Sequence, residues 1–298
     1  MQDLCPTVGT KHPDSILDVT PCERSMTAMI PMDYHIHSEH SCDCEESMEV
    51  MARAALAQGV RRMGFSDHFD RNPLDHGYDY LQPEAWWESL RSCQLLFTDT
   101  LSLQAGVEVG EPHRYPEDTR ALLESYPWDF VLGSLHWVDD QVVFGSEYFE
   151  HSPDEAYTKY FREMLRMVSE GDFDILAHMD VVKRYGYDNY GPFDPQRYEK
   201  EIRAVLKTLS ERGMAMEVNT STLRRPVGET SPGITILRWF HEEGGRHVTM
   251  GSDAHHTEHV GYGLQRAMHN LQQAGFTRLT AYKRRSPHPF DVETGRHT

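Results

Sequence analysis

The sequence predicts an α/β fold in which seven parallel strands and their helices form a barrel. From residue 31 onward, strand-like segments alternate with helix-like segments, as is typical of parallel βα units. Seven strand candidates can be counted, one fewer than in the common eight-stranded barrel. Each candidate carries a histidine or an acidic residue at or near its end. An open, doubly wound sheet is the alternative, because a sequence does not show whether a sheet closes.

The strand candidates share a short apolar run that is followed by polar residues. In chain order they span residues 32–37, 61–68, 101–109, 129–137, 173–180, 214–220 and 246–255. Helical patterns lie between them, for example at 47–59, 154–171 and 194–213, and each of these three ends at a glycine. The order of the elements therefore repeats strand and helix along the whole segment.

Residues 1–30 differ from the rest of the chain. They contain three prolines and Gly9 without sustained periodicity, so we expect a loosely ordered N-terminal extension before a single barrel domain at 31–298. The N-terminus lacks the basic-then-apolar layout of a signal peptide, and no apolar run approaches the ~20 residues of a membrane span. These features predict a cytoplasmic protein that does not bind membranes.

The composition narrows the possible ligands. The formal net charge of −18 argues against binding to a nucleic-acid backbone, but it does not exclude a small anion held at a metal. Eighteen histidines are many for one domain.

The five cysteines do not resemble a disulfide framework in a chain of this length, so we expect reduced thiols. Cys42 and Cys44 are one residue apart, which differs from the spacing of structural zinc motifs.

Ionisable residues gather at the ends of the predicted strands. His35 and His37 are two residues apart, so strand alternation points both imidazoles to the same side. The later strand ends carry Asp67 and His68; Glu108; His136; His178 and Asp180; Glu217 and Asn219; Asp253 and His255. In a barrel these ends meet on one face, where active sites are built. Mixed imidazole and carboxylate ligands suit zinc, iron or manganese, so the sequence predicts a metal site there.

Seven short stretches carry a resemblance to a known family. In order, they are DYHIHSEHSCD, FSDHFD, GVEVG, GSLHWV, ILAHMDVVKRYG, MEVNTS and GSDAH. With them the chain resembles the PHP (polymerase and histidinol phosphatase) superfamily, over residues 32–263. HMDVVKRYG followed by EVNTS points to its branch of monofunctional histidinol-phosphatases. The resemblance implies a distorted (β/α)7 barrel similar to a TIM barrel, which agrees with the seven strands counted above.

The resemblance also implies a set of metal ligands for two to three divalent transition metals (zinc, iron or manganese). The implied groups are His35, His37, Glu108 and Asp253 for the first metal; Glu108, His136 and His178 for the second; Asp43, His68 and His255 for the third. Glu108 would bridge the first two metals. Many relatives have a histidine in the place of Asp43. Glu108, Asp253 and His255 are further expected to be catalytic.

Residues near the strand ends are expected to bind substrate. Arg184 and Arg224 follow the fifth and sixth strands, and a planar guanidinium binds two phosphate oxygens at once. Arg225 and Lys183 compete for the same role. Asn219 is expected to orient water or substrate.

Several neighbours of the expected ligands are assigned lesser roles. Asp67, Asp180 and Glu217 are expected to accept hydrogen bonds from ligand imidazoles. His256 and His259 are expected to be solvated surface residues.

The leading hypothesis from the sequence is hydrolysis of L-histidinol phosphate to L-histidinol and phosphate. A related phosphoesterase that acts on a nucleotide, a sugar phosphate or phosphotyrosine is the first alternative. A metal-dependent amidohydrolase is disfavoured, because no lysine lies at a strand end to bridge metals as a carbamate. A non-enzymatic protein with a decayed site is disfavoured as well, because the implied ligand set has no gaps.

Overall fold

Seven strands follow one another around a closed parallel barrel in the computed structural model, which describes residues 29–291. Their order is β1-β2-β4-β5-β8-β9-β10, and the short β3 pairs with β4. Their bounds are β1 (Asp33–Ile36), β2 (Arg62–Phe65), β3 (His68–Phe69), β4 (Ser102–Gly110), β5 (Phe130–Ser134), β8 (Ile175–Leu176), β9 (Ala215–Asn219) and β10 (Val248–Gly251). The predicted α/β barrel of seven strands is confirmed.

The barrel closes where the first strand meets the segment that follows the last. The backbone N–H of Asp253 donates to the carbonyl of His35 (2.8 Å), and that of His37 donates to the carbonyl of Ala254 (3.0 Å). These bonds exclude the open sheet. They also fix His35 and His37 beside Asp253, which are three of the residues expected to bind metal.

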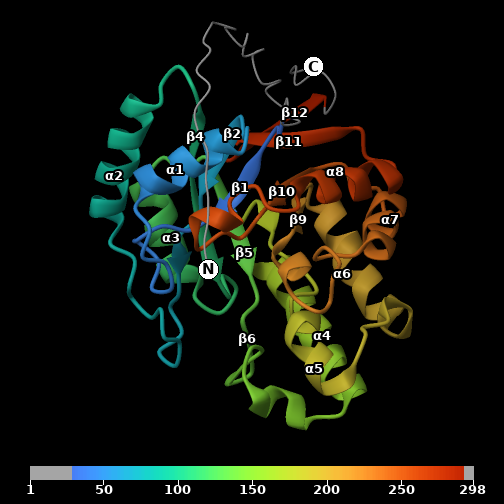
Figure 1. Cartoon of the computed structure of the whole chain (residues 1–298). Helices are drawn as coiled ribbons and strands as arrows, with labels where there is room; N and C mark the ends of the chain where they lie inside the picture. Colours follow the sequence, from blue (N-terminus) through green and yellow to red (C-terminus); the bar gives the residue numbers. More distant parts are fainter. Residues whose placement is uncertain (1–28, 292–298) are drawn as a thin grey trace, which may run out of the picture.

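The helices surround the barrel. Helices α1 to α3 lie on one side in Figure 1 and α4 to α8 on the other. Their bounds are α1 (Met48–Ala57), α2 (Pro83–Leu96), α3 (Pro116–Ser125), α4 (Pro153–Glu170), α5 (Val182–Tyr190), α6 (Glu199–Glu211), α7 (Ile234–Glu242) and α8 (Leu264–Gln273), with 3₁₀ turns η1 (Ser146–Glu150), η2 (Pro195–Tyr198), η3 (Ser221–Arg224) and η4 (Thr257–His259). In the described part of the chain, no helix is both long and apolar enough to cross a membrane.

The three helical patterns named from the sequence are found. Residues 47–59 and 154–171 contain α1 and α4, and the hydroxyl of Ser152 caps α4 by accepting from the N–H of Glu155. The pattern at 194–213 divides into the 3₁₀ turn η2 and helix α6.

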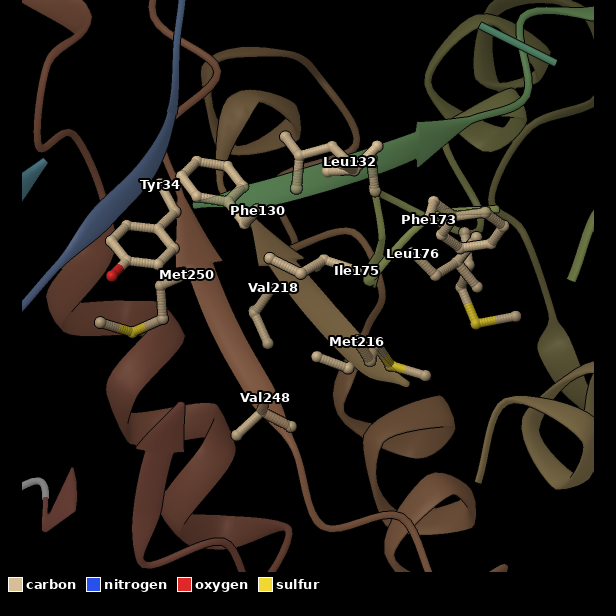
Figure 2. Packing of buried hydrophobic residues seen from close by; sticks show 14 of the residues in the cluster. Tyr34, Phe130, Leu132, Phe173, Ile175, Leu176, Met216, Val218, Val248 and Met250 are labelled. Carbon is tan, nitrogen blue, oxygen red and sulfur yellow. The ribbon is translucent and has the colours of Figure 1, made fainter. Parts of the chain in front are cut away.

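Aromatic side chains fill the barrel below the strand ends. The rings of Tyr34 and Phe130 stack at 4.7 Å, and Figure 2 shows them beside the apolar side chains of β9 and β10. Gly64 lies on β2 and Gly106 on β4. A β-carbon at either position would overlap the ring of Phe130. The glycines therefore leave room for one large ring, and the barrel is a packed core rather than a pore.

A hairpin that the sequence analysis did not anticipate covers the amino-terminal end of the barrel. Strands β11 (Arg278–Lys283) and β12 (Ser286–Asp291) pair antiparallel. Arg285 forms an ion pair with Asp174 (3.1 Å), which precedes β8, and Lys283 pairs with Asp129 (3.3 Å), which precedes β5. The carboxyl ends of the strands are therefore left as the open end.

The predicted strand at 129–137 is shorter than expected. β5 ends at Ser134, and a separate small hairpin follows, formed by β6 (Trp137–Val138) and β7 (Gln141–Val142). Glu111 accounts for this break, because its carboxylate accepts from the backbone N–H groups of His136 (2.6 Å) and Trp137 (3.0 Å). His136 consequently lies in the link between β5 and β6.

The expected extension at 1–30 lies outside the described residues except for Met29 and Ile30. Ile30 is buried and pairs with Val60.

Candidate metal centre

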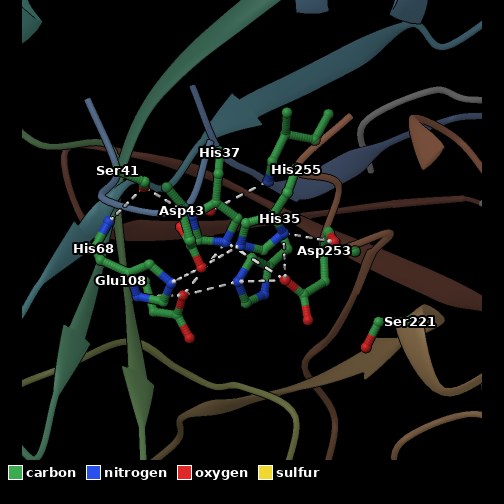
Figure 3. Close-up of polar contacts among 12 residues, drawn as sticks. His35, His37, Ser41, Asp43, His68, Glu108, Ser221, Asp253 and His255 are labelled. Carbon is green, nitrogen blue, oxygen red and sulfur yellow. Dashed lines mark hydrogen bonds and ion pairs between the residues drawn. The ribbon is translucent and has the colours of Figure 1, made fainter. Parts of the chain in front are cut away.

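All nine side chains expected to bind metal converge at the carboxyl ends of the strands. Figure 3 labels His35, His37, Asp43, His68, Glu108, Asp253 and His255 among them. One donor atom from each member of the following groups lies within 4.8 Å of the others: His37, Asp43, His68 and His255; His35, His178 and Asp253; His35, His37 and Glu108; His68, Asp70 and His136; Glu108, His136 and His178. Asp70 is the one member that the sequence analysis did not select. The groups share members, so they form one cluster.

Glu108 lies at the centre of this cluster and is 1% exposed. Its Oε2 is 3.0 Å from Nε2 of His35 and 3.2 Å from Nδ1 of His68. Its Oε1 is 2.9 Å from Nε2 of His178 and accepts from the hydroxyl of Ser134. Burial alone would raise the pKa of Glu108, but the neighbouring imidazoles of His35 and His68 hold it well below its usual value. The carboxylate is therefore ionised.

The tautomer of His37 shows why the cluster fits a cation. The hydroxyl of Ser41 donates to Asp67 (2.9 Å), so it must accept from Nδ1–H of His37 (3.0 Å). Burial, together with the charges of His255 and His68, lowers the pKa of His37 to about 4, so its Nε2 is unprotonated at neutral pH.

This Nε2 faces two carboxylate oxygens, Oε2 of Glu108 and Oδ1 of Asp253, each 3.5 Å away. Within residues 29–291 it has no hydrogen-bond donor. Three acceptors that face one another favour a cation between them.

His35 is oriented from behind in a similar way. Its Nδ1 lies 2.8 Å from Oε1 of Glu217, which leaves Nε2 directed at Glu108. Glu217 was expected to contact a ligand imidazole, and it does. Gly251 on β10 makes this contact possible, because a β-carbon there would overlap Glu217.

The structure differs from the sequence-based expectation at Asn219. This residue is fully buried behind His35 and is not among the residues that line the cavity. Its amide donates to Oε2 of Glu217 (3.2 Å) and accepts from the N–H of Ser221 (2.9 Å). Asn219 therefore supports Glu217, and contact with substrate is not supported.

Asp180 and Lys183 also differ from expectation. Asp180 binds the Nζ of Lys183 (2.7 Å) and the hydroxyl of Ser231 (2.5 Å) rather than an imidazole. Lys183 is buried and binds Glu229 as well, so it is directed away from a phosphate site. The reason is local: β8 has two residues, and His178 adopts a left-handed backbone conformation (φ 54°), so strand alternation does not extend to Asp180.

Asp253 shares this unusual backbone conformation (φ 55°). Non-glycine residues seldom adopt positive φ, and they do so where surrounding contacts hold them. Arg224 supplies such contacts, because its Nη1 and Nη2 donate to the carbonyls of Ser252 (2.8 Å) and Asp253 (2.9 Å). Arg224 therefore holds the segment that carries Asp253.

The third expected group lies nearest to solvent. Oδ2 of Asp43 is 3.0 Å from Nε2 of His255 and 3.7 Å from Nε2 of His68. The side chain of Asp43 is 47% exposed, whereas those of Glu108 and His35 are buried. Burial would raise the pKa of Asp43, but its hydrogen bond with His255 and its contact with His68 lower it well below the usual range. This group forms the rim of the cluster.

A cavity of about 680 Å³ lies above the cluster. Beyond cluster residues, its lining includes Asp75, Trp137, Phe144, Arg184, Tyr185, Arg224, Arg225, His256 and His259. Arg184 and Arg224 were expected there. His256 is exposed, as expected, and His259 is half-buried; both also line this cavity. Nε of Arg184 is buried, and no residue of the described part accepts a hydrogen bond from it.

Three supporting residues were missed by sequence reasoning. The hydroxyl of Ser41 accepts from Nδ1–H of His37, and the carboxylate of Glu111 accepts from the backbone N–H of His136. Oδ2 of Asp70 lies 3.8 Å from Nδ1 of His68. Burial raises the pKa of Glu111 to about 7 and that of Asp70 to about 6. Asp70 follows the predicted FSDH strand end by two residues, which was the available signal for it.

Fold and cluster together define a class: an α/β barrel with a candidate metal centre at the carboxyl ends of its strands. The family model described as PHP domain matches residues 33–221, which is more than half of the chain. The chain therefore belongs to the PHP domain family.

Histidinol-phosphatases are among the known proteins to which this chain is similar. The chain is 26% identical over 257 residues to a histidinol-phosphatase of Lactococcus lactis, covering 85% of this chain and 95% of that protein. It is 28% identical over 244 residues to a probable histidinol-phosphatase of Clostridium acetobutylicum, covering 79% and 91%. The crystal structure of histidinol phosphate phosphatase from Lactococcus lactis, complexed with zinc, L-histidinol and phosphate, is similar with a TM-score of 0.81 and 25% identity, covering 87% of this chain and 99% of that one.

The hydrogen bond behind His35 can be tested by the variant Glu217→Gln. The loss of one charge should weaken the orientation of Nε2, so we expect metal affinity to fall by about ten- to a hundredfold. Competition with a chromophoric chelator measures this. Glu124→Gln, on the exposed surface of α3, is the matched control and should leave the affinity unchanged. Equal affinity in both variants would show that Glu217 does not support a ligand.

Proposed function

We propose that this protein is a metal-dependent phosphomonoesterase that hydrolyses L-histidinol phosphate to L-histidinol and phosphate. The observation that carries the proposal is the meeting of three buried acceptors, on His37, Glu108 and Asp253, beneath a cavity lined by arginines. Such acceptors favour cations, and arginines beside them suit a phosphate dianion. The similarity to histidinol-phosphatases over most of the chain supports the choice of substrate.

We infer that two to three divalent ions, zinc, iron or manganese, occupy the cluster. His35, His37, Glu108 and Asp253 would hold the first; Glu108, His136 and His178 the second; Asp43, His68 and His255 the third. Mixed nitrogen and oxygen donors suit these metals better than magnesium or calcium. When bound, such ions supply Lewis acidity at the phosphoryl group and a nucleophile at neutral pH.

The protein's own side chains would hold the substrate. Arg184 lines the cavity, so its guanidinium is the strongest candidate to bind a non-reacting phosphoryl oxygen. Arg224 would contribute charge while it holds the segment of Asp253, and exposed Arg225 would act at the cavity mouth. Phe144 and Tyr185, whose ring centroids are 4.7 Å apart, provide an aromatic wall for the organic part of the ester. Asp253 and His255 would face the phosphoryl group from the cluster.

Turnover on a panel of phosphate esters tests the proposed function. The panel is L-histidinol phosphate, a nucleoside monophosphate, a sugar phosphate and phosphotyrosine, each assayed with metal content measured on the same sample. We expect kcat/KM for L-histidinol phosphate to exceed the others by at least about tenfold, a difference of roughly 1.4 kcal/mol. Chelator should abolish the activity. A higher kcat/KM for another ester would favour the alternative phosphoesterase, and one metal or fewer per loaded chain would contradict the metal assignment.

The arginines provide a sharper test, because the structure gives them different contacts. Arg184→Ala removes a charge-assisted contact of roughly 1.5 to 3 kcal/mol, so kcat/KM should fall by about ten- to a hundredfold with metal content unchanged. Arg184→Lys should restore part of the loss, since an ammonium cannot reproduce the two-pronged contact.

Arg224→Ala is expected to behave differently. It removes the two hydrogen bonds from the guanidinium to the backbone carbonyls of Ser252 and Asp253, so metal content should fall together with activity. Arg225→Ala should have the mildest effect of the three. A silent Arg184→Ala would mean that phosphate is held without this residue.

A further inference from the structure

Helix α5 carries Arg184 to the cavity, yet it begins without a capping side chain. Val181 occupies the N-cap position and makes no side-chain hydrogen bond to the helix. Arg184 and Tyr185 lie in the first turn of α5, and both line the cavity. Nε of Arg184 has no acceptor within residues 29–291. The direction of Arg184 therefore depends on the backbone that carries it.

Lys183 fastens this first turn from the buried side. It is 1% exposed, and each of its three ammonium hydrogens has an acceptor. The acceptors are Oδ2 of Asp180 (2.7 Å), Oε1 of Glu229 (2.8 Å) and the carbonyl of Thr230 (2.9 Å). A buried ammonium is costly unless it is paired, so these contacts hold together. They tie the start of α5 to the segment that precedes α7.

That segment is itself fixed to the barrel. The backbone N–H of Ser231 donates to the carbonyl of Asn219 (2.9 Å), and its carbonyl accepts from the N–H of Asn219 (2.8 Å). The hydroxyl of Ser231 donates to Oδ1 of Asp180 (2.5 Å). Asn219 ends β9 and supports Glu217 behind His35. The frame that orients a candidate metal ligand therefore also holds the partners of Lys183.

Lys183 and Arg184 are consecutive in the helix, so their side chains leave it about 100° apart. With Lys183 fixed beneath α5, the helix cannot turn about its axis, and Arg184 stays directed at the cavity. We propose that Lys183 is a positioning residue for phosphate, which acts by fixing the direction of Arg184 relative to the candidate metal centre. This inference rests on the proposed function, in which Arg184 binds a phosphoryl oxygen.

Binding of inorganic phosphate to the zinc-loaded protein tests the proposal without requiring turnover. Calorimetry gives Kd for the wild-type protein, Lys183→Met, Arg184→Ala and the double variant, with metal content measured on the same samples. Lys183→Met should raise Kd by about tenfold when Arg184 is present, and by less than about twofold when Arg184 is already alanine. Such non-additivity is not expected from a general loss of stability. Metal content should stay equal.

Two further variants complete the test. Asp180→Asn/Lys183→Met removes both charges, so that no unpaired carboxylate is left buried at residue 180. It should show the same rise in Kd, and the rise should again disappear with Arg184→Ala. Lys207→Met is the matched control, because Lys207 is exposed on α6 and its Nζ lies 3.8 Å from Oε1 of Glu211. It should leave Kd unchanged.

Other outcomes would overturn the proposal. Equal Kd in the wild-type protein and the Lys183 variants would show that α5 does not need this anchor. Equal rises with and without Arg184 would show that Lys183 acts elsewhere, and loss of metal would show that it acts through the metal centre. If even the charge-neutral variant does not fold, Lys183 serves the stability of the barrel instead. A zinc-loaded wild-type protein that binds no phosphate would contradict the proposed function, whereas bound phosphate that is indifferent to Lys183 would contradict this inference alone.

Discussion

The structure depends on one buried carboxylate, Glu108, which is surrounded by imidazoles. Nitrogen atoms of His35, His37, His68, His136 and His178 lie between 2.9 and 3.5 Å from its oxygens. Removing a charge from water is costly unless it is paired, so these imidazoles must carry protons or share cations with Glu108. Strand β4 makes the arrangement possible, because it is long and pairs with β2, β3 and β5, which brings the neighbouring strand ends to its own.

Residues behind the cluster fix which nitrogen His37 and His35 offer. The hydroxyl of Ser41 donates to Asp67 and accepts from Nδ1–H of His37. The amide of Asn219 donates to Glu217, whose carboxylate accepts from Nδ1–H of His35. In both cases an anchored acceptor takes the Nδ1–H, so the free Nε2 points toward the carboxylates. Metal-ligating histidines are commonly oriented in this way, and the orientation raises their basicity. The cluster is therefore preorganised for cations by bonds that lie behind it.

Sequence reasoning predicted much of this arrangement, because strand alternation and the convergence of strand ends are properties of the backbone. His35, His37 and Glu108 follow from those rules alone. The rules did not anticipate the surroundings of Asn219 and Asp180. Asn219 lies deeper than the cavity, behind His35, and β8 ends at Leu176, before the chain reaches Asp180. Ser41 and Glu111 lie in bends, where no period relates a residue's position to the direction of its side chain, whereas Asp70 directly follows β3 and pairs with Tyr78.

We propose that Glu108 is shared between two metal ions. Anomalous diffraction from crystals of the zinc-loaded protein, recorded on both sides of the zinc absorption edge, tests it most directly. We expect at least two anomalous peaks, with the two carboxylate oxygens of Glu108 each at about 2.0 to 2.2 Å from a different peak. A single peak, or two peaks of which Glu108 reaches one or neither, would show that Glu108 does not bridge two metals.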